Sequence, residues 1–256
     1  MSAYAKLISL KNETFFNRLT DPRLCFRCVL SDGRSGRFCL RCKHVGQGAV
    51  GQACVLGRPR MRANRHMGRA RQGENGGMGG AVSGPIKGKI ISDIIREYKP
   101  KKILEIGSLY GYSAILIANV MSGYDDDIKV VTIEIDKNNG YIAKGNIKDA
   151  ELSNKIELIT GDALEVIPKL GYKFDILFLD AAKDHYIQYL KLSEEANIIK
   201  NDAIIIADNV GISKNEMIDY LEYVRNSGKY KSKTIETTLE YSKDVRDAIE
   251  VSVRVA

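Results

Sequence analysis

The sequence lacks any long apolar run. None of its hydrophobic stretches approaches the ~18 residues that a membrane-spanning helix needs. Residues 1–16 carry Lys6 and Lys11 among their apolar positions, so they do not match the hydrophobic region of a secretory signal. These absences argue against a membrane or secreted protein and predict a cytoplasmic globular chain with no membrane partner.

Two nucleotide-binding signatures are missing from the glycine-containing turn "LEIGSLYGYS" (104–113). The turn has no Gly-x-Gly-x-x-Gly pattern, so it does not support a loop that cradles a dinucleotide pyrophosphate. It has no Gly-Lys-Ser/Thr either, which excludes a nucleoside-triphosphate loop at this position.

Basic residues are present in excess, but only in one part of the chain. The net charge is +7, whereas residues 21–80 alone hold 11 Arg and 1 Lys against 3 acids, or +9, so that the other 196 residues sum to −2. All five cysteines lie in the same part. The composition predicts a Cys/Arg/Gly-rich N-terminal segment (1–80) and a second domain over residues 81–256.

The second domain shows regular apolar patterning. Ser83-Gly84-Pro85 predicts a helix start, and Pro100 marks the end of that helix. Beyond it, five apolar strands alternate with helical stretches, and two late strands follow with no helix between them. This order predicts an α/β fold with a seven-stranded, mostly parallel sheet and a C-terminal antiparallel hairpin. The predicted strands are 102–107, 129–135, 155–160, 174–180, 203–208, 233–241 and 247–255.

Two glycines and two acids surround the first strand end. Gly107 and Gly111 allow the backbone to pass close to a ligand. Glu105 lies inside the first strand, and Glu134 falls at the end of the second, where a carboxylate suits the ribose hydroxyls of a nucleoside. The alternative is a structural turn with a solvated glutamate.

Oxygen ligands follow two further strands. Asp180 ends the fourth strand and Asp208-Asn209 ends the fifth. Because the ends of parallel strands meet at one edge of a sheet, these side chains are expected to lie close together. Two carboxylates and an amide suit Mg²⁺ or another divalent cation. The alternative is that the acids cap the helices that follow.

Residues 78–256 resemble the catechol O-methyltransferase family of S-adenosylmethionine-dependent enzymes. The resemblance implies a Rossmann-like class I methyltransferase fold, the donor S-adenosylmethionine and Mg²⁺ or a similar cation. The matching stretches, in family order, are "GPIKGKIISDIIREY", "ILEIGSLYGYSA", "TIEID", "FLDAAKDHY", "IIIADNV" and "TLEYSKDVRDAIE".

The resemblance also implies roles for individual residues. The implied donor contacts are Ser83, Glu105, Gly107, Gly111, Ser113, Glu134, Asp162, Ala163 and Asp180. The implied metal ligands are Asp180, Asp208 and Asn209, with Lys183 as the catalytic lysine. The implied substrate contacts are Lys183, Asn209 and Glu240.

One departure from the family concerns the acceptor. Vertebrate members place His and Trp between the metal aspartate and the lysine, where this chain has Ala181-Ala182. An aromatic wall against the substrate ring is therefore missing at this position. We interpret Asp184 and His185, which follow the lysine, as a cap and a surface residue.

These observations predict a metal-dependent O-methyltransferase that acts on a hydroxyl of a small catechol-like aromatic, with Lys183 as the base. One alternative is methylation of a hydroxylated base in tRNA or another RNA, with the basic segment as the RNA handle. Another is a non-catalytic interaction protein, which the complete set Asp180, Lys183, Asp208 and Asn209 argues against. The sequence leaves open a monomer or a homodimer.

The cysteine spacing has the form of a zinc site. Cys25, Cys28, Cys39 and Cys42 form two Cys-x-x-Cys pairs, although the loop between the pairs is shorter than usual. The alternatives are a disordered segment, or a segment translated out of frame or joined by a wrong gene model, because its biased composition need not fold.

Overall fold

The computed structural model describes residues 85–239 and 242–256. These described residues all belong to one compact unit. The zinc hypothesis, the basic segment and two predicted contacts therefore lie outside the described residues and stay predictions. The residues concerned are Cys25, Cys28, Cys39, Cys42, Ser83 and Glu240.

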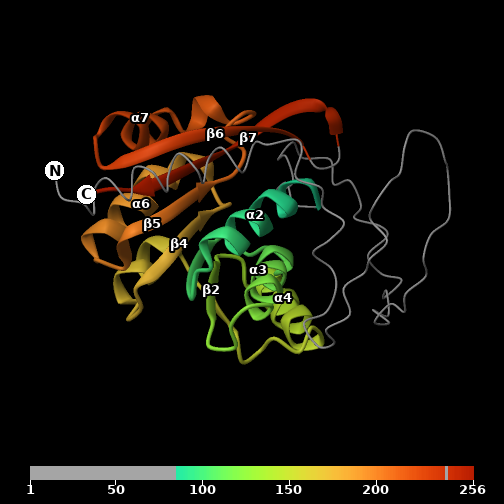
Figure 1. The fold of residues 1–256 in the computed structure, drawn as a ribbon. Coiled ribbons are helices and arrows are strands. Elements are labelled where there is room, and N and C mark those ends of the chain that lie inside the picture. Colours follow the sequence, from blue (N-terminus) through green and yellow to red (C-terminus); the bar gives the residue numbers. More distant parts are fainter. Residues whose placement is uncertain (1–84, 240–241) are drawn as a thin grey trace, which may run out of the picture. The chain divides into compact units, whose positions relative to one another are not determined.

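Seven strands form one sheet in the order β3-β2-β1-β4-β5-β7-β6. The first five pair in parallel, and β7 is antiparallel to both β5 and β6, as predicted. In Figure 1, β6 and β7 are the red pair beside β5. The strands are β1 (Lys102–Ile106), β2 (Lys129–Glu134), β3 (Ile156–Thr160), β4 (Phe174–Leu179), β5 (Ile199–Ala207), β6 (Tyr230–Leu239) and β7 (Ser242–Arg254).

The predicted start of the fifth strand was wrong. β5 begins at Ile199 rather than at residue 203, because Ile199 pairs with Phe174 ahead of an irregular step in the β4–β5 register. Asn201 and Asp202 are exposed there, so the first part of β5 carries no apolar pattern. The hairpin strands likewise begin three and five residues earlier than predicted.

Helices cover both faces of the sheet. Within β1, Ile103 packs into one apolar cluster and Leu104 into the other, as the alternation of a strand requires. The helices of the Ile103 face are α2 (Pro85–Tyr98), α3 (Tyr112–Ser122) and α4 (Lys137–Asp149). Those of the Leu104 face are α5 (Ala163–Val166), α6 (Tyr186–Glu195) and α7 (Ile218–Asn226). None of these described helices is long and apolar enough to cross a membrane.

The central strands bring the predicted site residues together. The backbone pairing continues one residue past the strands, because Asp180 N donates to Ile106 O and Asp208 N donates to Leu179 O, both at 3.0 Å. The chain passes from β3 across β1 to β4, so the reversal of strand order lies beside these ends. Ligands of open α/β sheets bind at such a position.

Gly107 is where the first strand end meets the fourth. Its φ is 97°, and a Cβ at this position would lie 2.2 Å from the backbone oxygen of Asp180. Both the left-handed backbone and this close approach require glycine. Gly107 therefore sets the spacing between the β1 turn and the end of β4.

We expect Gly107→Ala to lower the free energy of unfolding by about 3 kcal/mol or more, because the added methyl must displace backbone. Gly145→Ala is the matched control: Gly145 lies within α4, and a Cβ there meets open space. That change should stabilise the protein by roughly 0.5–1 kcal/mol. Urea unfolding followed by circular dichroism measures both. A Gly107→Ala variant as stable as wild type would contradict the role given to this contact.

Candidate active site

The turn after β1 surrounds a buried acid. Glu105 is fully buried, and Thr132 Oγ1 donates to its Oε2 at 2.5 Å. Gly111, with a φ of 81°, leads into α3, which carries the buried Ser113 in its first turn. Burial raises the pKa of Glu105 to about 7, although the hydrogen bonds from Ser113 and Thr132 oppose this. A nearby cation would therefore stabilise the ionised form of this carboxyl group.

Two polar atoms of this turn have no hydrogen-bond partner among the described residues. They are Oε1 of Glu105 and Oγ of Ser108, and both are buried. Buried polar groups of this kind are rare unless a ligand or water satisfies them. An ammonium group, such as that of a methionine moiety, would supply the missing donor to Glu105. The residues present therefore fit the donor that the sequence predicts.

Glu134 connects the ends of β1 and β2. Its Oε2 accepts from Leu109 N at 2.7 Å and its Oε1 accepts from Asp136 N at 2.9 Å. The side chain is buried rather than solvated, so the alternative of a solvated glutamate is wrong. Each carboxylate oxygen can accept a further hydrogen bond, which is what two vicinal hydroxyls would need.

Asp162 and Ala163 lie at the end of the neighbouring strand. Gly161 N donates to Glu134 O at 2.9 Å, which keeps this turn beside the end of β2. Asp162 caps α5 by accepting from Leu164 N at 2.9 Å, and Ala163 is buried in the first turn of that helix. The turn thus borders the same edge of the sheet as Glu134.

Asp180, Asp208 and Asn209 lie at adjacent strand ends, as expected. The two helical segments after Asp180 have Ala182 and His185 as N-cap residues and no side-chain cap hydrogen bond, so the capping alternative is wrong for Asp180. Burial and the carboxylate of Asp180 raise the pKa of Asp208, although Lys87 opposes this. A divalent cation between the two acids would relieve this repulsion.

The donor chemistry of the three residues fits a hard cation. No group of three or more His, Cys, Asp or Glu suited to a metal occurs in residues 85–239 and 242–256, and the predicted set instead combines two carboxylates with the amide of Asn209. Asn209 Nδ2 donates to Asp247 Oδ2 at 2.9 Å. The amide oxygen is therefore the side-chain atom of Asn209 that is left to bind a cation, and Mg²⁺ prefers oxygen.

Lys183 lies directly beside this group. Its Nζ donates to Asp180 Oδ1 at 3.1 Å and to the hydroxyl of Tyr186 at 2.8 Å. Tyr186 is fully buried and donates in turn to Leu179 O at 2.8 Å, so it fixes the amine from behind. Asp184, predicted as a cap, is exposed and makes no capping hydrogen bond to α6, so that interpretation is wrong. His185, predicted as a surface residue, is only partly exposed.

Sequence reasoning missed two residues behind this group, Lys87 and Asp247. Lys87 Nζ lies 2.7 Å from Asp208 Oδ1 and 2.6 Å from Asp247 Oδ2, and all three side chains are at most 1% exposed. Burial alone would lower the pKa of Lys87, but the two carboxylates raise it overall. A signal was present, since Lys87 shares the apolar stripe of α2 with Ile91 and Ile94.

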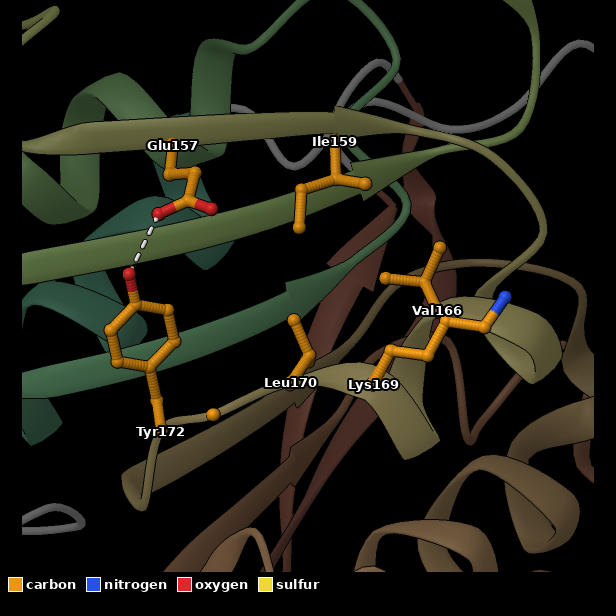
Figure 2. Close-up of a pocket in the computed structure, with 7 residues that line it drawn as sticks. Glu157, Ile159, Val166, Lys169, Leu170 and Tyr172 are labelled. Carbon is orange, nitrogen blue, oxygen red and sulfur yellow. Dashed lines mark hydrogen bonds between the residues drawn. The ribbon is translucent and has the colours of Figure 1, made fainter.

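One cavity in the described part of the chain lies away from these residues. It measures about 540 Å³, between β3 and the turn that precedes β4. Figure 2 shows Glu157 and Ile159 on one side and Leu170 and Tyr172 on the other, with Tyr172 bonded to Glu157 at 3.1 Å. A smaller cavity, of about 210 Å³, includes Lys183 in its lining. Only the smaller one touches a predicted site residue.

Comparison with known proteins identifies the family. A family model described as O-methyltransferase matches residues 81–223, more than half of the chain. The chain belongs to the O-methyltransferase family. Catechol O-methyltransferase B of Danio rerio is 35% identical over 178 residues, which cover 66% of this chain and 64% of that protein. Catechol O-methyltransferase of Mus musculus is 33% identical over 175 residues, with the same two coverages.

The O-methyltransferase match does not extend over whole relatives. The chain spans less than two thirds of the length of either of these two proteins. Among solved structures, the O-methyltransferase of Bacillus cereus in complex with SAH superposes with a TM-score of 0.61 at 24% identity, over 69% of this chain and 84% of that chain. This likeness confirms the Rossmann-like class I methyltransferase fold.

We expect Glu105→Gln to stabilise the ligand-free protein, and more so at pH 8 than at pH 5. In wild type the pKa of Glu105 is 4.5 in the unfolded chain and about 7 in the folded protein. The free energy of unfolding therefore falls as the pH rises through this range. The gain at pH 8 should be about 3 kcal/mol by urea unfolding.

Glu157→Gln is the control with the opposite sign. The ammonium of Lys129 lowers the pKa of Glu157, so this change should cost stability at neutral pH and little at acid pH. Equal effects of Glu105→Gln at both pH values would contradict a buried carboxyl group with a raised pKa.

Proposed function

We propose that this protein is a divalent-metal-dependent O-methyltransferase that transfers the methyl group of S-adenosylmethionine to a hydroxyl of a small catechol-like aromatic. The observation that carries the proposal is the position of the Lys183 amine, 3.1 Å from Asp180, at the strand end beside Asp208-Asn209. The names of the relatives, catechol O-methyltransferases, support the acceptor class.

The donor would bind along the ends of β1, β2 and β3. Glu105, with its unpaired oxygen, would hold the ammonium of the methionine part. Glu134 would accept from the ribose hydroxyls, since two backbone N–H groups already fix its carboxylate in place. Asp162 and Ala163 would border the adenine, because their turn is bonded to the end of β2.

The acceptor oxygen must become a good nucleophile. In the transfer its bond to the methyl carbon forms as the carbon–sulfur bond breaks, and the donor leaves as a neutral thioether. A cation held by Asp180, Asp208 and Asn209 would lower the pKa of the acceptor hydroxyl. Lys183 would take the proton as a neutral amine and become an ammonium paired with Asp180, while Tyr186 and Asp180 would hold it at this position.

The acceptor pocket should be wider than one lined by an aromatic gate. Ala181 is half-buried and Ala182 is exposed, so only two methyl groups follow the metal aspartate. We therefore propose that other surfaces select the acceptor, and that substituted catechols are tolerated.

We expect Lys183→Met to reduce methyl transfer at least 100-fold, because general base catalysis contributes roughly this much. Binding of the donor should change less than two-fold, since Lys183 is absent from the β1–β3 ends. Lys191→Met is the matched control: Lys191 is an exposed lysine of α6 that lies over the ring of Tyr223. Transfer of labelled methyl and calorimetric binding of the donor measure the two effects. Near-normal turnover of Lys183→Met would refute the base.

We expect a chelator to abolish methyl transfer to catechols, because removal of the cation takes away the charge that lowers the pKa of the acceptor hydroxyl. Added Mg²⁺ should restore the transfer. A methyl-donor assay on a panel of catechols and on bulk tRNA, with and without Mg²⁺, is the decisive experiment. Transfer to tRNA alone would favour the RNA alternative. Transfer to neither would favour a non-catalytic interaction protein.

A further inference from the structure

The loop that carries Asn209 has an unusual backbone. Asn209 has a φ of 63°, in the left-handed region that asparagine tolerates better than most residues. Two residues later, a Cβ on Gly211 would lie 2.7 Å from Cα of Asp247. Val210 N also donates to Ala248 O at 3.0 Å. The loop after β5 is therefore pressed against the middle of β7.

One carboxylate holds this loop. Asp247 Oδ1 accepts from Gly211 N at 3.2 Å and from Ile212 N at 3.1 Å. Asp247 Oδ2 accepts from Asn209 Nδ2 at 2.9 Å. The same side chain thus bonds the backbone that follows Asn209 and the amide of Asn209 itself. These contacts fix both the position and the orientation of that amide.

Lys87 compensates the buried negative charge of Asp247. Its Nζ lies 2.6 Å from Asp247 Oδ2 and 2.7 Å from Asp208 Oδ1. An unpaired charge would be costly at this depth, whereas a bridging ammonium compensates both acids. Asp208 and Asp247 are thereby joined through a single cation of α2. The end of β5 at Asp208 and the part of β7 at Asp247 are therefore held together by Lys87.

We propose that Asp247 is a positioning residue of the metal site. By accepting from the amide nitrogen of Asn209, it leaves the amide oxygen as the atom presented to a divalent cation. This inference rests on the proposed function, because it needs Asp180, Asp208 and Asn209 to bind a metal. It adds a residue that contacts neither the cation nor the substrates and acts through Asn209.

The test is a double-mutant cycle on Mn²⁺ affinity, measured by electron paramagnetic resonance on the full chain. Asp247→Asn keeps the volume, but the new side chain has one acceptor where the carboxylate has two, so one set of donors faces an NH₂ group. We expect Asp247→Asn to weaken Mn²⁺ binding about 10-fold, in the range for groups that orient metal ligands. Binding of the methyl donor should change less than two-fold.

The second arm separates positioning from charge. Asn209→Gly removes the amide and tolerates the left-handed backbone. In that background Asp247→Asn should weaken Mn²⁺ binding less than two-fold further, because there is no amide left to orient. Glu250→Gln is the control: it removes a buried acid of the same strand that pairs with Arg225 instead, and it should leave Mn²⁺ affinity unchanged.

A third variant covers the case in which Asp247→Asn does not fold. Asp247→Glu keeps the charge but displaces the carboxylate, so it too should weaken Mn²⁺ binding. Additive effects in the cycle, or wild-type affinity in either Asp247 variant, would overturn the positioning role and leave the proposed function intact. A wild-type protein that binds no Mn²⁺ would overturn both.

Discussion

The backbone hydrogen bonds that run one residue past β1, β4 and β5 determine the rest of the site. They bring Asp180 beside Ile106 and Asp208 beside Leu179, so the side chains that follow these strands share one edge of the sheet. Gly107 then lets the first turn touch the backbone of Asp180. The proposed donor and metal sites therefore belong to one rigid frame, and little freedom would remain in how the two reacting groups meet.

This edge gathers more negative than positive charge. Glu105, Asp208 and Asp247 are fully buried, and Lys87 is the only Lys or Arg among the buried residues of the described ranges. Lys87 compensates part of this negative charge, whereas Oε1 of Glu105 has no hydrogen-bond partner among the described residues. A site of this kind gains most from positively charged ligands, which agrees with a sulfonium donor that carries an ammonium group and with a divalent cation.

Much of this arrangement was predictable, because parallel strands end together and their polar ends are visible in the sequence. The positions of Asp180, Asp208 and Asn209 follow from that rule alone. The partnership of Lys87 with Asp247 does not, since periodicity records burial of apolar residues and treats a lysine in an apolar stripe as an exception. The start of β5 was missed for the converse reason, because exposed polar residues there form a strand through pairing with β4.

The support of Asn209 by β7 has a consequence for the order in which the protein is made. The two strongest anchors of the loop after β5 come from opposite ends of the described chain, Lys87 from its first helix and Asp247 from its last strand. During synthesis the sheet can grow from β1 through β5, yet the proposed metal site has no carboxylate behind Asn209 until residue 247 has left the ribosome. The proposed site thus depends on the terminal hairpin, which closes the edge of the sheet and also supports Asn209.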